Sequence, residues 1–346
     1  MEHKTKKILI IGPSFHYFNE CLQRSFVNKG FNTKVYAIVN KTTINDRVYY
    51  WIFKRQTNKF KIKNVNFNSI EVMKKFTDFE PDIVLIIKGN SITSATLKYM
   101  KEKAIVLLWM MDSLKYNYIN SSDLALYDKI FVFEKTDLDI LTSIDLNGVF
   151  LPLAFDPQIY YKIDVKKDID ISFVGVLGSH YKTRVTILEN LIKDFPNLNI
   201  KIYGTYISKK RVFKYYRFKK SILSKSFMNH NVNQKEINMI YNRSKICLNI
   251  HHKQSDMGWN PRTVEILGSG NFQICDYKKL IHNEFENSLV LFNDYNDLKM
   301  KIDYYLSNYD EAENIAFTGY NQVIYKDTYD NRIDIILNEV ALITKW

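Results

Sequence analysis

The sequence predicts an α/β protein with two parallel-sheet domains that face each other across a cleft. Three observations lead to this prediction. Short β-branched apolar runs alternate with helical stretches, the alternation pauses near residues 149–157, and it then starts again. A chain of 346 residues is long enough for two such domains, each with its own core. The pattern is typical of Rossmann-like domains, which bind ligands at the carboxyl ends of their strands.

The first domain is expected over residues 1–155. The runs expected to form its strands are 7–11, 33–39, 82–88, 104–109 and 129–133. Its helices are expected at 18–29, 69–79 and 93–103, with Gly30 as the C-cap of the first and Pro81 beyond the end of the second. The strand at 82–88 is a continuous apolar run, so both of its faces are expected to be buried in a parallel sheet.

The second domain is expected over residues 156–328, after the crossing segment FLPLAFDP at 150–157. Its strands are expected at 169–174, 198–203, 246–250, 272–275 and 289–292, and its helices at 181–193, 234–243, 262–268 and 297–308. The last part, residues 329–346, is expected to form a helix that packs back on the first domain. Two basic and aromatic stretches, 49–64 and 209–225, do not fit the alternation.

The composition is that of a globular protein, with 46% hydrophobic and 25% charged residues. Cys21, Cys247 and Cys275 show no metal-ligand spacing, which fits free thiols in a reducing cytoplasm. No apolar run approaches the length of a membrane span, and the short N-terminal run is interpreted as a strand rather than a signal peptide. The formal net charge of +12 favours an anionic partner: a nucleotide diphosphate, a phospholipid surface, a phosphate-containing acceptor or nucleic acid.

The segment from Asn249 to Asp276 carries the strongest functional signal. A strand leads through a polar loop into a helix, whose N-terminus offers backbone amides and a positive dipole end to a diphosphate. Arg262 has the fork geometry that suits phosphate oxygens, and Glu265 can accept hydrogen bonds from ribose hydroxyls. A solvated helix residue is the alternative interpretation of Glu265. The candidate donor-binding residues of this segment are Asn260, Arg262, Thr263 and Glu265.

A second candidate phosphate-binding stretch is FVGVLGSHYKTR at 173–184, which contains the end of the first strand of the second domain. Gly175 and Gly178 allow the backbone to approach a phosphate closely, and Arg184 can neutralise a leaving diphosphate. Tyr203 and Gly204, at the end of the next strand, are further candidate donor-binding residues. An ordinary β–α turn is the alternative interpretation of the glycine pair.

Several stretches resemble the CgeB-type spore-maturation and polysaccharide glycosyltransferases, which have the GT-B fold and a glycosyltransferase family 1/4-like C-terminal domain. They are LPLAFDPQIY (151–160), DISFVGVLGSHYKTR (170–184), IYNRSKICLNIHH (240–252) and GWNPRTVEILGSGNFQICD (258–276). The resemblance implies that Glu265, five residues before Gly270, holds the ribose of a nucleotide-sugar donor. Retaining members usually carry a second acidic residue eight positions earlier. Here Met257 has that place, with Asp256 beside it as the candidate, so retention or inversion stays open.

The candidate residues of the first domain follow the ends of its predicted strands, where acceptor contacts are expected. The candidate acceptor-binding residues are Ser14, Lys88 and Asn90. His16 is a candidate base or acceptor ligand, and Asp112 can orient or deprotonate an acceptor hydroxyl. The alternatives are a bystander role for His16 and a helix N-cap formed by Asp112 or Ser113.

The sequence predicts an enzyme that needs neither a metal nor another cofactor. His251 and His252 are adjacent on an extended chain, so they point to opposite sides and cannot easily share an ion. The aspartates at 164, 168 and 170 lie in a linker and at a strand start, where a solvated turn is expected. Helix dipoles and cationic side chains would then stabilise the leaving group in place of a metal.

The predicted function is transfer of a sugar from a nucleoside diphosphate sugar to a hydroxyl of a glycan, lipid-linked or protein acceptor, in surface glycan, polysaccharide or spore-coat biosynthesis. A cytoplasmic enzyme is expected. Whether stretch 209–225 contacts the inner face of an anionic membrane or the acceptor is left open. Nucleic acid is not an expected partner. The alternatives are a nucleotide-sugar epimerase on the same fold and a non-catalytic binder of nucleic acid or anionic surfaces.

Overall fold

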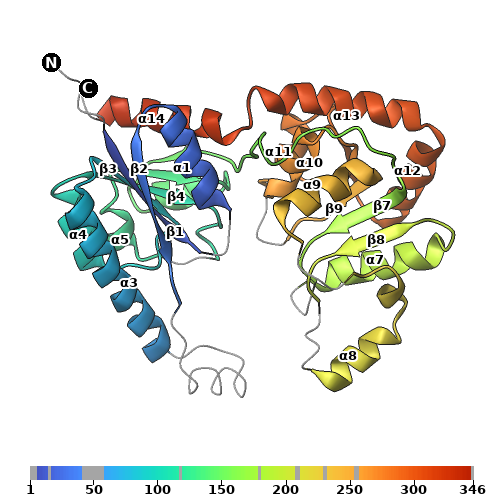
Figure 1. Cartoon of the computed structure of the whole chain (residues 1–346), viewed down its shortest axis with the longest axis horizontal. Coiled ribbons are helices and arrows are strands. Elements are labelled where there is room, and N and C mark those ends of the chain that lie inside the picture. The colour runs from blue at the N-terminus through green and yellow to red at the C-terminus, as the bar shows by residue number, and fades with distance from the viewer. Residues whose placement is uncertain are drawn as a thin grey trace. The chain divides into compact units, whose positions relative to one another are not determined.

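The computed structural model describes residues 6–14, 17–40, 58–116, 119–177, 181–206, 211–228, 232–252 and 257–343. The chain divides into two compact units (Figure 1). Unit 1 consists of Met1–Pro152 and Tyr329–Trp346, and unit 2 consists of Leu153–Thr328. Each unit contains one parallel sheet with helices packed against it, which confirms the predicted fold class of two parallel-sheet α/β domains.

The sheet of unit 1 has the strand order β2-β1-β3-β4-β5-β6, with every neighbouring pair parallel. Its strands are β1 (Lys7–Pro13), β2 (Asn32–Ile38), β3 (Ile83–Ile87), β4 (Ile105–Met110), β5 (Lys129–Val132) and β6 (Gly148–Phe150). Five of them lie within two residues of the predicted ranges. Strands β1, β3, β4 and β5 are buried along almost their whole length, whereas β2 lies at the edge of the sheet and is only partly buried. The sequence pattern did not reveal β6, a three-residue strand at the edge of the sheet.

Helices cover both faces of this sheet. In Figure 1, α1 (Phe18–Asn28) and α14 (Tyr329–Ile343) lie on one face, and α3 (Asn58–Phe79) and α4 (Ser94–Lys101) lie on the other. Two short helices, α5 (Ser121–Leu124) and α6 (Asp137–Thr142), precede β5 and β6. Gly30, with a φ of 85°, follows α1 and donates its N–H to the carbonyl of Val27, so the predicted helix end is confirmed.

Helix α14 contacts α1 and is tied to unit 1 by two ion pairs. The Nζ atom of Lys29 lies 2.5 Å from Oδ1 of Asp334, and the Nζ atom of Lys129 lies 2.6 Å from Oε2 of Glu339. The Nε atom of Arg332 also donates a hydrogen bond of 2.7 Å to the carbonyl of Pro152. The last helix of the chain therefore belongs to the same compact unit as its first strand.

The sheet of unit 2 has the order β11-β10-β9-β7-β8, again with all neighbouring pairs parallel. Its strands are β7 (Ile169–Val174), β8 (Ile200–Tyr203), β9 (Ser244–Asn249), β10 (Gln273–Asp276) and β11 (Val290–Phe292). Its helices are α7 (Lys182–Asp194), α8 (Val212–Lys219), α9 (Gln234–Arg243), α10 (Pro261–Gly268), α11 (Lys279–Glu284), α12 (Tyr295–Ser307) and α13 (Tyr309–Ile324), with a 3₁₀ turn, η1, at Ile222–Lys225. The stretch 209–225, which did not fit the alternation, thus contains a helix and a 3₁₀ turn.

The three cysteines are buried free thiols. Within the described residues, no helix combines the length and the apolar character needed to cross a bilayer.

Candidate functional site

The carboxyl ends of β7 and β9 form the natural ligand position of unit 2. Strand β7 pairs with β8 on one side and with β9 on the other. The chain adds β8 on one side of β7 and then adds β9, β10 and β11 on the other side, so the strand order reverses between β7 and β9. In open parallel sheets, ligands bind outside the carboxyl ends of the strands at such a switch point. The loops that leave β7 and β9 begin at Gly175 and Ile250, and the candidate site is built around them.

Arg184 spans this switch point from the first turn of α7. Its Nε atom donates a hydrogen bond of 2.9 Å to the carbonyl of Ile250, and its Nη1 atom donates one of 3.2 Å to the carbonyl of Val176. The ring of Tyr181 stacks on the guanidinium at 4.5 Å, and only 5% of the arginine is exposed. The guanidinium is therefore held in one orientation between the two loops.

The electrostatics of this position favour an anionic ligand. Burial, followed by the nearby positive charge of Arg262, lowers the pKa of Arg184 to about 10, against the opposing effects of Tyr181 and Asp276. Two guanidinium groups that repel each other in a partly dehydrated site are stabilised when a phosphate lies between them. The same two arginines were singled out in the sequence, and the structure brings them together from α7 and α10.

Gly175 and Gly204 let two loop backbones meet at the ends of β7 and β8. A Cβ atom on Gly204, whose φ is 134°, would lie 2.1 Å from the carbonyl oxygen of Gly175, so only glycine fits there. Tyr203 is 8% exposed and interacts electrostatically with Arg243 and Asp168, which flank the amino ends of β9 and β7.

Helix α10 presents its N-terminus beside these loops. Pro261 is its first residue, where a missing N–H costs nothing, and Asn260 is the N-cap. The Asn260 side chain does not cap the helix; its Nδ2 atom instead donates a hydrogen bond of 2.9 Å to Oδ1 of Asn249. Asn260 thereby fixes the start of α10 to the end of β9, and the positive end of the helix dipole is held at the site.

A buried polar network joins α10 to strands β9 and β10. Nδ2 of Asn249 donates to Oε1 of Gln273 at 2.9 Å and to Oγ1 of Thr263 at 3.1 Å. Nε2 of Gln273 in turn donates to the backbone carbonyl of Thr263 at 3.1 Å. Thr263 is fully buried, so its hydroxyl positions the helix within the protein. Every bond in this network joins α10 to β9 or β10, or joins those two strands to each other.

His251 and Asp276 close the network at the ends of β9 and β10. Oδ1 of Asp276 accepts a hydrogen bond of 2.7 Å from the backbone N–H of His251 and lies 2.8 Å from its Nδ1 atom. Burial raises the pKa of the Asp276 carboxyl, but the hydrogen bonds and charge of His251 outweigh it, so the net shift is downward. His252 contacts the ring of Tyr181, with the two ring centroids 4.8 Å apart.

His251, Cys275 and Asp276 are the one group among the described residues that could hold a metal ion. Their candidate ligand atoms lie within 4.8 Å of one another. Burial raises the pKa of the Cys275 thiol well above its usual value, and its Sγ atom lies 3.5 Å from the backbone carbonyl of Asp276. Nδ1 of His251 is already directed at Asp276. The group therefore fits a hydrogen-bonded support for β9 and β10 better than a metal centre.

Glu265 lies one turn into α10 and is only 5% exposed. Its charge acts on the buried phenol of Tyr241, whose pKa is raised first by burial and then by Glu265, while Arg262 acts in the opposite direction. The glutamate is therefore a buried residue close to Arg262, and the solvated-surface interpretation of Glu265 is wrong.

In unit 1, the candidate residues at the ends of β3 and β4 meet as a pair. The Nζ atom of Lys88 lies 2.5 Å from Oδ2 of Asp112, and both side chains are partly exposed. Lys88 adopts a left-handed φ of 72°, followed by Gly89 at 71°, which turns the chain sharply at the strand end. No helix starts at Asp112 or Ser113, so the N-cap interpretation is wrong; the Ser113 hydroxyl donates instead to the buried Asp137 at 2.8 Å.

The other candidates are placed as follows. Ser14 follows β1 and is exposed, and Asn90 accepts a hydrogen bond of 3.3 Å from the hydroxyl of Ser91. His16, Gly178 and Asp256 lie outside the described residues.

Residues 184–338, which include Arg184 and all of α10, match a family model described as glycosyl transferase-like. The matched residues cover most of unit 2 and the first part of α14. The chain is also 22% identical over 275 residues to spore protein CgeB of Bacillus subtilis, covering 75% of this chain and 83% of CgeB. The resemblance to CgeB-type proteins indicated by the sequence is thereby confirmed.

Solved structures share the fold of both units. Sucrose-phosphate synthase from Thermosynechococcus elongatus has a TM-score of 0.71 at 10% identity, covering 98% of this chain and 100% of that one. HepE of Anabaena, solved in complex with UDP and with UDP-glucose, has a TM-score of 0.64 at 10% identity, covering 97% and 99%. These similarities confirm the GT-B fold.

Sequence reasoning missed several residues of unit 2 that hold the site together. They are Asn249, His251, Gln273, Asp276 and Tyr181. A signal for part of the group was available. Amide side chains at the end of one apolar parallel strand and at the start of the next are costly to bury unless they pair with each other.

Proposed function

We propose that this protein transfers a sugar from a nucleoside diphosphate sugar to a hydroxyl acceptor. The observation that supports this most directly is the buried guanidinium of Arg184, held across the switch point of unit 2 and close to Arg262. A pair of cations beside the N-terminus of α10, of which Arg184 is buried and Arg262 partly exposed, suits a diphosphate. The glycosyltransferase-like domain match covers these residues and supports the same activity.

In the reaction, the bond between the sugar anomeric carbon and the diphosphate oxygen breaks, and a bond to the acceptor oxygen forms. Negative charge develops on the leaving diphosphate, and the acceptor hydroxyl loses a proton. Arg184, Arg262 and the dipole of α10 would stabilise the leaving group without a metal ion. We assign Glu265 to the donor ribose and keep Asp256 as the candidate acid near the sugar. Stereochemistry is not assigned.

A uridine nucleotide is the donor we favour. HepE of Anabaena, which shares the fold, was solved with UDP and with UDP-glucose. The acceptor is assigned to the strand ends of unit 1, where Ser14, Asn90 and the Lys88–Asp112 pair provide hydroxyl, amide and charged groups. The similarity to a spore protein supports a role in surface glycan, polysaccharide or spore-coat biosynthesis.

The test is a thermal shift of the purified protein with UDP, GDP, CDP, ADP and dTDP, repeated on Glu265→Ala. Stabilisation by one nucleotide, abolished by Glu265→Ala, is the expected result, because a ligand that binds only the folded state raises its apparent stability. Glu286→Ala, at an exposed glutamate of unit 2, is the control and keeps the shift. Absence of a shift with all five nucleotides would sink the proposal. Conversion of the donor sugar without an acceptor would favour an epimerase instead.

We also propose that helix α8 brings the enzyme to an anionic membrane surface. The helix buries Phe218, which packs against Phe227 at 5.5 Å, while Phe213 is 92% and Tyr216 is 61% exposed. Within 211–228, six Lys or Arg residues and no acidic residues occur. Exposed aromatics flanked by cations suit the headgroup region of an anionic bilayer.

Vesicle co-sedimentation tests this surface. The wild type is expected to pellet with phosphatidylglycerol-containing vesicles but not with pure phosphatidylcholine vesicles, and to be released by salt. Phe213→Ala combined with Tyr216→Ala should weaken binding severalfold, while Tyr325→Ala, at an aromatic that is 81% exposed elsewhere, should not. Equal binding to both vesicle types, or no loss in the double variant, would contradict the assignment.

A further inference from the structure

A second cavity of unit 2 lies at the opposite ends of the strands from Arg184. Its volume is about 470 Å³, within the range of small-molecule sites. Asn242, just before β9, and Asn271 and Phe272, just before β10, line it. Because Arg184 and Arg262 follow the carboxyl ends of these strands, the cavity is separate from the proposed donor site.

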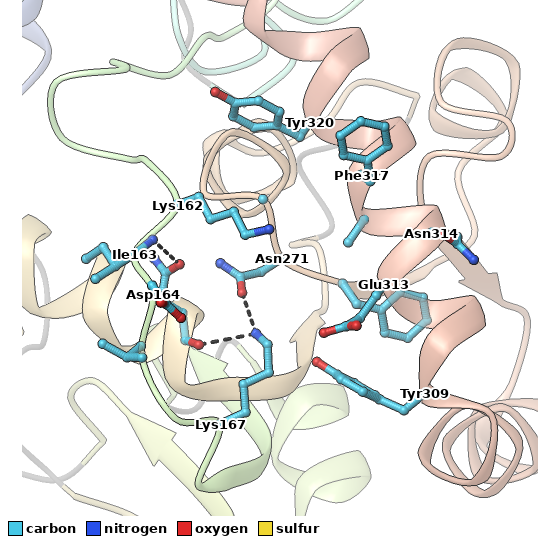
Figure 2. Close-up of a pocket in the computed structure, with 15 residues that line it drawn as sticks. Lys162, Ile163, Asp164, Lys167, Asn271, Tyr309, Glu313, Asn314, Phe317 and Tyr320 are labelled. Carbon is cyan, nitrogen blue, oxygen red and sulfur yellow. Dashed lines mark hydrogen bonds between the residues drawn. The ribbon is translucent and has the colours of Figure 1, made fainter.

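Two walls of different character enclose this cavity. Helix α13 forms one wall with Tyr309, Phe317 and Tyr320. The extended segment between the crossing and β7 forms the other, with Lys162 and Asp164. In Figure 2, the Lys162 side chain extends from this segment across the cavity, above Asn271. Phe317 is 64% exposed, so its ring is open to a ligand.

The floor of the cavity is fixed by Lys167. Its Nζ atom donates hydrogen bonds of 2.8 Å to Oδ1 of Asn271 and 2.9 Å to the carbonyl of Ser244 (Figure 2 shows the first). Gly270 adopts a φ of 68°, and a Cβ atom there would lie 3.4 Å from the Cβ atom of Lys162. The Lys167 hydrogen bonds, together with one of 2.8 Å from the backbone N–H of Ile163 to Oδ1 of Asn242, hold the extended segment in place, so the shape of the cavity is largely preformed.

The charges of the cavity balance. Lys162 and Lys167 face Asp164 and Glu313, so two formal positive charges meet two negative ones. Burial lowers the pKa of Lys167, and the negative charge of Glu313 opposes this shift. The charges of Lys167 and Glu313 are therefore close enough to interact. An anionic ligand such as a nucleotide would gain little in such a site. A neutral ligand with many hydrogen-bonding groups would find both donors and acceptors.

We propose that this cavity binds a neutral saccharide segment. Aromatic rings offer apolar faces that suit the C–H faces of a pyranose, and the surrounding lysine, carboxylate and amide groups suit its hydroxyls. If the acceptor is a glycan, as the proposed function implies, the cavity holds a part of that glycan remote from the reacting end. Remote attachment raises the effective concentration of the acceptor at the enzyme.

The test begins with binding of the wild-type protein, without nucleotide, to an array of neutral and acidic oligosaccharides. Titration calorimetry of the best neutral oligosaccharide then follows on Phe317→Ala and on Tyr325→Ala, the latter at an exposed aromatic outside the cavity. The expected result is a loss of affinity of tenfold or more in Phe317→Ala only. Absence of any neutral binder, preference for acidic glycans, or equal affinity of both variants would overturn the proposal.

A nucleotide readout separates this inference from the proposed function. Phe317→Ala should keep the full thermal shift with UDP, since the cavity and the donor site lie at opposite ends of the strands. Saccharide binding without any nucleotide shift would leave the cavity assigned and overturn the transferase. A nucleotide shift with no saccharide binding would do the reverse.

Discussion

The strand ends of unit 2 and unit 1 differ in how their polar groups are held. In unit 2, Arg184 and Glu265 are each 5% exposed. Two backbone carbonyls hold the Arg184 guanidinium, and a network that includes Asn249 and Gln273 fixes α10, which carries Glu265. In unit 1, Lys88 and Asp112 form a partly exposed ion pair. The same donor can serve many acceptors, and a site for one fixed ligand works best when it is rigid and preorganised. The difference therefore fits a rigid donor site in unit 2 and a more adaptable acceptor site in unit 1.

The largest effect is expected from removing the charge of Arg184 in unit 2. Arg184→Met keeps much of the side-chain volume but loses the charge and both hydrogen bonds to the loops. We expect the transfer rate to fall by about 10²–10³-fold, as for the loss of one preorganised electrostatic group. The thermal shift with UDP should disappear as well. Arg243→Met, at an exposed arginine paired with Asp168, is the matched control and should keep both. Similar losses in the two variants would contradict the assigned role.

Gly204→Ala should be the next largest effect, on stability. The added Cβ atom would overlap the Gly175 carbonyl, and the φ of 134° is unfavourable for alanine. We expect the free energy of unfolding to fall by about 2 kcal/mol or more, measured by urea denaturation. Gly30→Ala provides the comparison, because its positive φ meets no atom within 4 Å, and about 1 kcal/mol is expected there. Equal losses would show that the close backbone approach contributes nothing.

Asp112→Asn tests unit 1 and should have a smaller effect. Losing one charged hydrogen bond to the acceptor should lower the transfer rate about tenfold. The affinity for UDP should not change, because Asp112 belongs to the other unit. Asp139→Asn, at an exposed aspartate of α6, is the control. Loss of UDP binding in Asp112→Asn would remove the distinction between the donor and acceptor units.

Chelation is expected to have no effect at all. If Arg184, Arg262 and the α10 dipole stabilise the leaving diphosphate, a rate assay with excess EDTA should match the untreated enzyme. A loss of activity restored by Zn²⁺ or Mn²⁺ would instead point to His251, Cys275 and Asp276 as a metal site. In that case Asp276→Asn would prevent the metal ion from restoring activity. If the group is only a hydrogen-bonded support, no metal ion is needed for activity.

Differences between the predicted and observed helices have physical causes. Helix α3 starts at Asn58, eleven residues before its predicted start, because polar residues on its inner face break the apolar pattern. One of them, Asn68, is 1% exposed and pairs with both the N–H and the carbonyl of Val39 at the end of β2. Helix α13 was not predicted. Its Gly319 weakens the local signal, yet a Cβ atom there would lie 2.6 Å from the Ser288 carbonyl, so the packing requires glycine.

The sequence alone determined the fold class and every described strand except the short edge strand β6, because a strand buried on both faces must be apolar along its own length. It also indicated Arg184, Arg262 and Glu265, since helix starts after strands bind phosphates and the CgeB-like stretches contain them. Only the tertiary structure decided that Asn249, Gln273 and Asp276 act together. These residues are up to 27 positions apart, and the parallel register of β9 and β10 sets them side by side. Local periodicity carries no information about such pairing, because a hydrogen bond between strands depends on register and not on sequence neighbours.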